Sequence, residues 1–294
     1  MTTNCRVVGG LLFAMTIAAD SLFANRAPQE PIFASRVDTV RVDVSVRQGG
    51  RAVEGLMAAD FEVLDNGVRQ QVDFAALDQM PVNVVLALDM SGSVQGPRLA
   101  QLQEAGARLV DMLGPAESAA VVAFTDLVAI RSGFTADKTT LLSALQQPTE
   151  GTDTALVDAT HAALVLGGSR MGRPLVIVFS DGTDTASFLS SGLVLDTARR
   201  AGPVAYAVAS ARDGPNDFLD NLVRLTGGRR LEVSSLERLS DAFAEILSES
   251  RERYLLSYTP AGVPAGGWHD VIVRVPGRRA EVRARPGYLA PSIS

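Results

Sequence analysis

The chain has 294 residues, of which 47% are hydrophobic, and its formal net charge is -6 at pH 7. This length and composition allow one large domain plus a smaller one, and they exclude a disordered or fibrous chain. The basic residues are scattered arginines without a clustered basic face, which argues against nucleic acid as the main partner.

The first 24 residues have the pattern of a secretory signal peptide. One early arginine, Arg6, precedes a thirteen-residue apolar run, Val7–Ala19. Small residues then follow, with a cleavage position after Ala24. The run is short of the roughly 20 residues that a membrane span needs. The alternatives are a buried N-terminal helix, disfavoured because the run lacks helical periodicity, and an uncleaved signal anchor.

We therefore expect an exported protein, periplasmic, in the cell envelope or secreted, with no stable membrane span after signal cleavage. The single cysteine, Cys5, lies before the apolar run, whereas a lipoprotein signal would place its cysteine after the run. The mature chain would then contain no disulfide.

Residues 36–80 and 252–291 show strand patterns. The first segment alternates apolar and polar residues, as half-exposed antiparallel strands do. In FEVLDNGVRQQVDF, Asn66-Gly67 joins two such runs, which is a strong hairpin signal because both central turn positions need positive φ. The second segment contains YLLSYTP, HDVIVRVPG and AEVRARPGYLA. Neither segment has enough strands to be stable alone, so we expect them to pair as one small β-domain around an inserted domain.

Residues 82–250 alternate apolar strands with helices. The expected strands are VNVVLALD, AAVVAF, PLVIVFSD and PVAYAVAS. Pro97 suits the first turn of a helix, whose apolar face comprises Leu99, Leu102, Leu109, Met112 and Leu113. Non-alternating apolar strands separated by helices predict an α/β fold with a doubly wound, mostly parallel sheet covered on both faces.

Two of these strands end in aspartate, Asp89 and Asp181. Ligands of open parallel sheets bind outside the carboxyl ends of the strands. Ser91 and Ser93 follow Asp89 in DMSGS, and the Gly- and Thr-rich EGTDTALVDAT lies between the two strands. Oxygen ligands without His or Cys suit a hard cation such as Mg²⁺. A serine N-cap is the alternative, but it explains one residue and not the set.

Enzyme interpretations find less support in the sequence. A serine hydrolase needs a base, and the only histidines are His161, within an apolar helix pattern, and His269, beside Trp268 in the small β-domain. A Walker loop, a nucleophile elbow and a His-rich metal motif are all missing from the sequence. We therefore expect a binding protein and not an enzyme. A structural scaffold with incidental metal binding and a metal-dependent hydrolase are the alternatives.

The candidate residues resemble the metal-ion-dependent adhesion site (MIDAS) of the von Willebrand factor type A (VWFA) domain. The resemblance rests on Asp89-x-Ser91-x-Ser93, a threonine in a Gly- and Thr-rich loop before Leu156-Val157-Asp158-Ala159, and Asp181-Gly182. It implies a Rossmann-like VWFA domain over residues 82–250. It also implies a divalent ion, Mg²⁺ with Mn²⁺ or Ca²⁺ as alternatives, whose ligands would be Asp89, Ser91, Ser93, Thr154 and Asp181.

The same resemblance implies a role for each ligand. The serine hydroxyls would bind the metal, Thr154 would bind it directly or through water, and the aspartates would supply charge directly or through water. The family loop usually has Gly-Gly-Thr before Leu-x-Asp-Ala, whereas Gly151-Thr152-Asp153-Thr154 stands here. Spacing therefore favours Thr154, and Thr152 is the weaker candidate.

In this family the metal typically accepts a Glu or Asp carboxylate from a partner protein, so the resemblance implies cell adhesion or another protein–protein interaction. Four further segments, GLMAADFEVLDNG, TGGRRLEV, RYLLSYTP and VRARPGYLAP, resemble a bacterial subgroup of exported proteins with this domain, known from acidobacteria among others. The resemblance therefore covers about Val37 to Pro291.

Overall fold

The computed structural model describes residues 39–291, apart from residues 78–79, 149 and 212–213. The signal peptide expected over residues 1–24 lies outside this range. Among the described residues, no helix is both long enough and apolar enough to cross a membrane.

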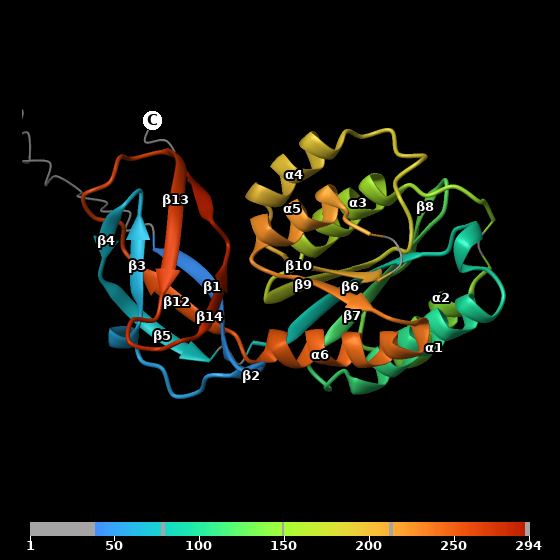
Figure 1. Cartoon of the computed structure of the whole chain (residues 1–294), viewed down its shortest axis with the longest axis horizontal. Helices are drawn as coiled ribbons and strands as arrows, with labels where there is room; N and C mark the ends of the chain where they lie inside the picture. Colours follow the sequence, from blue (N-terminus) through green and yellow to red (C-terminus); the bar gives the residue numbers. More distant parts are fainter. Residues whose placement is uncertain (1–38, 78–79, 149, 212–213, 292–294) are drawn as a thin grey trace, which may run out of the picture. The chain divides into compact units, whose positions relative to one another are not determined.

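Six strands form the central sheet in the order β11-β10-β9-β6-β7-β8. Their bounds are β6 Val82–Asp89, β7 Ser118–Phe124, β8 Val128–Thr135, β9 Arg173–Phe179, β10 Val204–Ser210 and β11 Arg230–Val233. Neighbouring strands are parallel except β7 and β8, which pair antiparallel. Every residue of β6, β7 and β10 is buried, because helices cover both faces of the sheet (Figure 1). The predicted doubly wound, mostly parallel α/β fold is confirmed.

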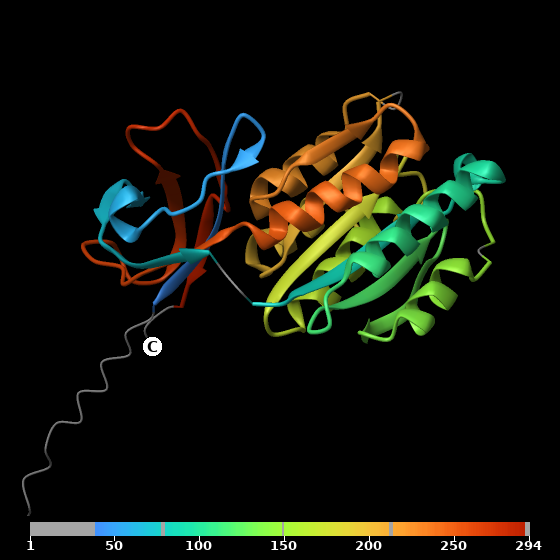
Figure 2. The ribbon, with the colours of Figure 1, turned by 90° about the horizontal axis from the view of Figure 1, so that it is seen from below.

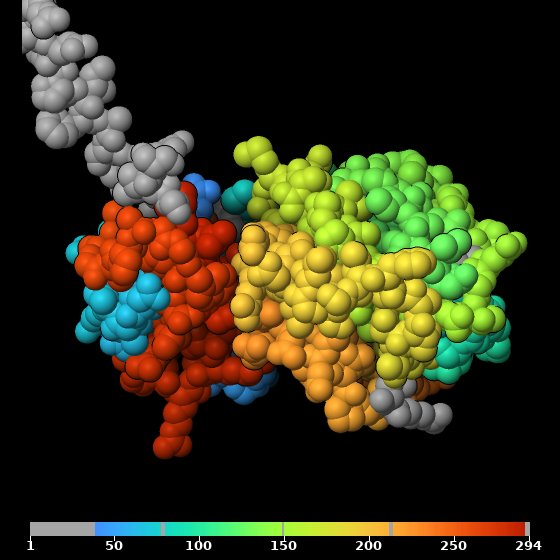
Figure 3. Space-filling model, turned by 90° about the horizontal axis from the view of Figure 1, so that it is seen from above, coloured from blue at the N-terminus to red at the C-terminus, as the bar shows by residue number. Residues whose placement is uncertain are grey.

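Helices α1, α2 and α6 cover one face of the sheet, and α3, α4 and α5 cover the other (Figures 1 and 2). Their bounds are α1 Pro97–Met112, α2 Lys138–Gln146, α3 Leu156–Gly168, α4 Ser191–Arg200, α5 Asp217–Thr226 and α6 Leu239–Arg251. Figure 3 shows the molecule from the side of α3, α4 and α5. Alternate residues of β6 enter different apolar clusters: Leu86 packs in the α1/α6 layer and Val85 in the α3/α5 layer. The sheet therefore separates two cores.

Several elements differ from the sequence pattern. Strand β8, strand β11 and helix α2 were not expected as separate elements. They are short or half-exposed, so their hydrophobic periodicity is weak. The start of α2 is instead capped by Asp137, whose carboxylate accepts hydrogen bonds from the N–H groups of Thr139 and Thr140. Met112 does not belong to the buried face of α1, because the helix ends there and the side chain is 37% exposed. Short 3₁₀ helices span η1 Ala58–Asp60, η2 Gly92–Val94 and η3 Leu236–Arg238.

The flanking segments form two smaller sheets, ordered β14-β1-β12-β5, with β2 beside β1, and β15-β13-β3-β4. Their bounds are β1 Val40–Gln48, β2 Arg51–Ala52, β3 Glu62–Asp65, β4 Val68–Gln70, β5 Val72–Leu77, β12 Tyr254–Tyr258, β13 Gly267–Arg274, β14 Glu281–Ala284 and β15 Gly287–Ala290. Strand β1 pairs with β12 and β14, and β3 pairs with β13. Strands from both ends of the chain thus interleave. The expected hairpin joins β3 to β4, with φ of 45° at Asn66 and 79° at Gly67.

Candidate metal centre

The two aspartates selected from the sequence lie at the ends of neighbouring strands. Strands β6 and β9 pair in parallel with Leu88 opposite Phe179, so the residues that follow reach the same edge of the sheet. Asp89 is the last residue of β6, and Ser180-Asp181 follows β9. The Ser180 hydroxyl donates a 2.7 Å hydrogen bond to Asp89 Oδ2. The fold therefore brings the two predicted strand ends together.

Hydrogen bonds link four of the five predicted ligands into one chain. The Ser91 N–H donates to Asp89 Oδ1 at 3.0 Å, and the hydroxyls of Ser91 and Ser93 are 3.2 Å apart. The Ser93 hydroxyl donates to Asp181 Oδ1 at 2.6 Å. Asp89 is fully buried and Asp181 is 8% exposed, whereas Ser93 reaches the surface. Four oxygen-bearing side chains thus converge at one accessible position.

Neither serine of this motif caps a helix through its side chain. The N-cap of α1 is Gly96, and Ser91, which precedes the short helix η2, makes no side-chain capping hydrogen bond. A side-chain N-cap by either serine is therefore not what the structure shows: the Ser93 hydroxyl donates to Asp181, and the Ser91 hydroxyl pairs with that of Ser93.

Thr154 belongs to the loop before α3 and is 6% exposed. Its N–H donates to Thr185 Oγ1 at 2.9 Å, which ties this loop to the one after β9. A Cβ atom on Gly182 would stand 3.7 Å from Thr154 Oγ1, so the threonine hydroxyl lies beside the residue that follows Asp181. Thr152 has an exposed side chain and contacts the motif through its carbonyl, which accepts a hydrogen bond from the Gly92 N–H.

Two other acidic residues hold the loops of the site in place. Asp184 Oδ1 accepts hydrogen bonds from the Val157 N–H at 3.1 Å and the Ser187 hydroxyl at 2.5 Å. The Asp158 carboxylate accepts from the N–H groups of Phe188 and Leu189, each at 2.9 Å. Their oxygens are used within the protein, which agrees with leaving Asp184 out of the ligand set.

Two residues of the site were missed in the sequence. Ser180 binds the Asp89 carboxylate, and Arg98, in the first turn of α1, pairs with Asp181 through Nη2 and Oδ2 at 2.5 Å. The Ser180 position, just before Asp181, was visible in the motif FSD. Nothing in the sequence around Arg98 indicated that its side chain turns toward Asp181, because the two residues are 83 positions apart.

The site places two carboxylates close together away from water. Burial raises the pKa of Asp89, the negative charge of Asp181 raises it further, and hydrogen bonds from Ser91 and Ser180 oppose both effects without cancelling them. A bound cation would relieve both the desolvation and the repulsion. Among the described residues no cluster of three or more His, Cys, Asp or Glu side chains could hold a metal. A metal here would need the hydroxyls, and an all-oxygen set of this kind suits a hard divalent cation.

Both histidines lie in other surroundings. His161 is half-buried in α3. His269 is 1% exposed in β13, where its Nδ1 lies 2.7 Å from Asp65 Oδ1 and 3.2 Å from the Tyr288 hydroxyl. Within the described part of the chain, neither histidine is hydrogen-bonded to Ser91 or Ser93.

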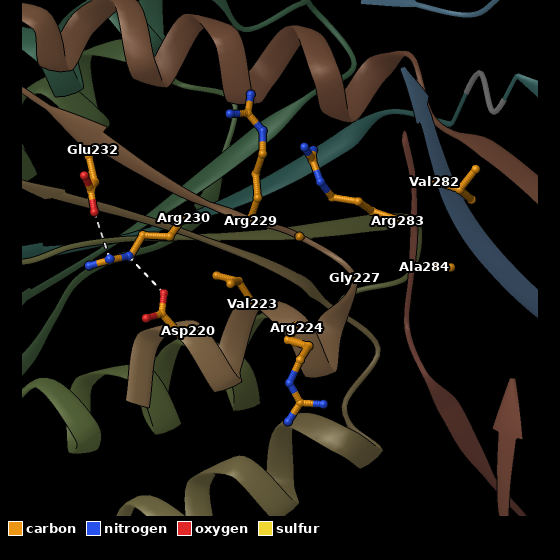
Figure 4. A pocket seen from close by; sticks show the side chains of 11 residues that line it. Asp220, Val223, Arg224, Gly227, Arg229, Arg230, Glu232, Val282, Arg283 and Ala284 are labelled. Carbon is orange, nitrogen blue, oxygen red and sulfur yellow. Dashed lines mark hydrogen bonds and ion pairs between the residues drawn. The ribbon is translucent and has the colours of Figure 1, made fainter. Parts of the chain in front are cut away.

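A pocket of about 530 Å³ opens beside α5, β11 and β14 and contains none of the predicted ligands. It is rich in arginine, but Arg230 pairs with Asp220 at 2.9 Å and with Glu232 at 2.8 Å (Figure 4). Arg229 pairs with Glu249, and Figure 4 shows the Arg224 side chain extending away from Arg229. The arginines are largely neutralised by neighbouring carboxylates, so this pocket is a weaker candidate for a functional site.

Comparison with known proteins identifies the segment that carries the candidate site. Residues 84–183 match the family model of the von Willebrand factor type A domain. No curated protein sequence matches the chain. Proximal thread matrix protein 1 from the mussel byssus, in a structure with a zinc-occupied MIDAS motif, aligns with a TM-score of 0.53 and 19% identity. The alignment covers 63% of this chain and 49% of the mussel protein, so the chain spans about half the length of that relative.

Two bacterial structures align with lower TM-scores. The D319A mutant of the PilB minor pilin from Streptococcus sanguinis has a TM-score of 0.49 and 12% identity, over 60% of this chain and 63% of that protein. The vWF domain of the pili tip protein Mfa5 from Porphyromonas gingivalis has a TM-score of 0.47 and 14% identity, over 57% and 94%. At these identities the likeness to solved structures concerns the fold alone.

Proposed function

We propose that the chain, whose residues 84–183 match the family model of the von Willebrand factor type A domain, is a non-enzymatic, extracytoplasmic binding protein that engages a partner through a divalent metal ion. The partner is a protein that presents a Glu or Asp carboxylate to the metal. The metal is held by Asp89, Ser91, Ser93, Thr154 and Asp181. The observation that carries this proposal is the hydrogen-bonded chain from Asp89 through both serines to Asp181 at the carboxyl edge of the sheet.

The composition of the ligand set favours binding of an anionic partner. Five oxygen ligands would leave one of the six octahedral positions of Mg²⁺ open to a further oxygen ligand, such as a carboxylate of a partner. When bound, the metal supplies the positive charge that an incoming carboxylate needs. The buried Asp89 and Asp181 would hold the ion together with the hydroxyls, and Ser93 is the exposed member of the set. The mussel relative with a zinc-occupied MIDAS motif supports a divalent ion at this position.

The non-enzymatic part of the proposal rests on what surrounds the serines. The base that activates a nucleophilic serine is most often a histidine, whereas the buried His269 faces Asp65 in the β-rich region, and the Asp181 carboxylate that accepts the Ser93 hydroxyl also pairs with Arg98. The extracytoplasmic location rests on the signal-like pattern of residues 1–24. Mg²⁺ is the proposed ion, with Mn²⁺ and Ca²⁺ as the alternatives to be compared.

Thermal unfolding with and without metal tests the proposal. The chain is heated with Mg²⁺, Mn²⁺, Ca²⁺ or EDTA, and Asp181→Asn and Ser91→Ala are compared with wild type. A ligand that binds only the native state adds about 2.7 kcal/mol at one hundred times its dissociation constant, which raises the melting temperature by about 5 °C for a chain of this size. Both substitutions should abolish the shift.

Asp153→Ala is the matched control, because Asp153 is an exposed acid in the same loop as Thr154. This variant should keep the full shift. Absence of a shift with all three cations would remove the metal from the proposal and leave a scaffold. Where a shift is seen, short peptides that carry one Glu should bind in Mg²⁺ and not in EDTA, and the matching Gln peptides should bind in neither.

A further inference from the structure

The Asp181 carboxylate is fully engaged by groups of the protein itself. Oδ1 accepts the Ser93 hydroxyl at 2.6 Å, and Oδ2 pairs with Arg98 Nη2 at 2.5 Å. The Asp181 side chain is 1% exposed, whereas 46% of the Arg98 side chain is open to solvent. A surface arginine from the first turn of α1 therefore reaches down to a buried carboxylate of the candidate metal centre.

The guanidinium offsets a charge problem within the site. Asp89 and Asp181 are both buried, and hydrogen bonds through Ser91 and Ser93 link them in one site. Two buried carboxylates in one place repel each other unless a cation compensates them. Among the described residues, Arg98 is the cationic side chain that contacts either of them. Arg98 supplies one positive charge at the place where the proposed dication would supply two.

Little else in the protein holds Arg98 in this position. In the part of the chain that the structure describes, Asp181 is the one hydrogen-bond partner of its guanidinium. By contrast, the buried Arg253 binds Asp43, Tyr206 and the Gly227 carbonyl. Within the described residues, Arg98 can therefore leave Asp181 without breaking another hydrogen bond or ion pair.

We infer that Arg98 is a tethered cation that competes with the divalent metal for the Asp181 carboxylate and so sets the metal affinity of the site. The inference rests on the proposed function, because it concerns regulation of the same centre. Metal binding must either release the guanidinium from Asp181 or bring a dication close to a positive charge. Either effect lowers the affinity of the site for the metal. An arginine with a purely structural role would have no such effect on metal affinity.

Removing the charge of Arg98 should therefore have two effects of opposite sign. In EDTA, Arg98→Gln should lower the melting temperature, because the two buried carboxylates lose their counter-ion. In isothermal titration with Mg²⁺ or Mn²⁺, the same variant should bind metal about tenfold more tightly than wild type, a change of about 1.4 kcal/mol. Arg98→Lys keeps the charge and should stay closer to wild type.

Arg108→Gln is the matched control, because Arg108 lies on the same helix and pairs with the exposed Glu104 at 2.7 Å. It should leave the metal affinity unchanged. If Arg98→Gln is poorly folded by circular dichroism, Arg98→Met tests the same point with a side chain of similar length.

The outcomes separate this inference from the proposed function. Equal or weaker metal binding by Arg98→Gln, with binding by wild type intact, overturns the inference and leaves the proposed function in place. Failure of wild type and all Arg98 variants to bind any of the three cations overturns both. Binding by Arg98→Gln but not by wild type supports the inference in its strongest form.

Discussion

Substitution of Glu249 by glutamine should strongly destabilise the protein, because this carboxylate is the buried centre of a charge network. Its side chain is fully buried on α6, where it pairs with Arg229 at 2.8 Å and with Arg283 at 3.1 Å. It also accepts hydrogen bonds from the hydroxyls of Tyr206 at 2.9 Å and Ser45 at 3.2 Å. These partners come from strands β10, β1 and β14 and from the residue before β11, so one carboxylate connects the inserted α/β region to the β-rich region.

The size of the effect follows from what Glu249→Gln leaves behind. Removing one partner of a buried ion pair costs about 3–5 kcal/mol. The lower end applies here because Arg229 keeps Glu245 and Arg283 keeps Glu281 as exposed partners. A loss of about 3 kcal/mol corresponds to a fall of about 5 °C in melting temperature for a chain of this size. Differential scanning calorimetry at pH 7 measures it.

Glu245→Gln provides a matched control for this substitution. Glu245 lies on the same helix and pairs with the same Arg229, but 52% of its side chain is exposed. An exposed pair contributes about 0–1 kcal/mol. Equal and small losses for the two variants would refute the reasoning, since they would show that solvent screens both pairs alike.

The cost of Glu249→Gln should also depend on pH. Burial by itself would raise the pKa of Glu249, but the neighbouring guanidinium of Arg229 and the hydroxyl of Tyr206 outweigh it and hold the pKa below its ordinary value of 4.5. A carboxyl with a lowered pKa contributes stability above its ordinary pKa, and that contribution is lost as the pH falls through the folded-state value. The difference between wild type and Glu249→Gln should therefore shrink below pH 4.5. A difference that grows on acidification would contradict the assignment of charges.

Two further substitutions test packing and burial. Gly228→Ala should lower the free energy of unfolding by about 3 kcal/mol, because the new Cβ would stand 2.0 Å from the Ala205 carbonyl oxygen. Gly192→Ala is the control, because a Cβ at this position in α4 would meet no atom within 4 Å. In the same calorimetric assay the control should stay within about 1 kcal/mol of wild type. Asp65→Asn should cost about 2 kcal/mol, because this buried carboxylate accepts hydrogen bonds from two tyrosine hydroxyls at 2.9 and 2.8 Å. Urea unfolding followed by the fluorescence of Trp268, the only tryptophan, measures that loss, and an unchanged midpoint would show that the cluster adds nothing.

The local sequence pattern was sufficient for the main elements and for most of the candidate site. The unbroken apolar run of residues 82–89 predicted a strand buried on both faces, and β6 is buried throughout. The Asn66-Gly67 pair predicted the hairpin between β3 and β4. The spacing Asp89-x-Ser91-x-Ser93 placed three oxygen-bearing side chains close together, because residues this close in the chain leave one strand end together. Periodicity and turn chemistry are properties of short segments, and they can be read without a fold.

Only the tertiary structure decided which distant residues meet. Pairing of β6 with β9 brings Ser180 to Asp89, 91 positions away in the chain. It also brings Asp181 to Ser93, 88 positions away. The same packing turns Arg98 toward Asp181 and gathers the partners of Glu249 from four parts of the chain. Short half-exposed elements such as β8 and α2 likewise depend on their neighbours. The charges on these residues are visible in the sequence, but their pairing depends on through-space distance. Strand order and helix packing determine that distance, and a local sequence pattern does not contain it.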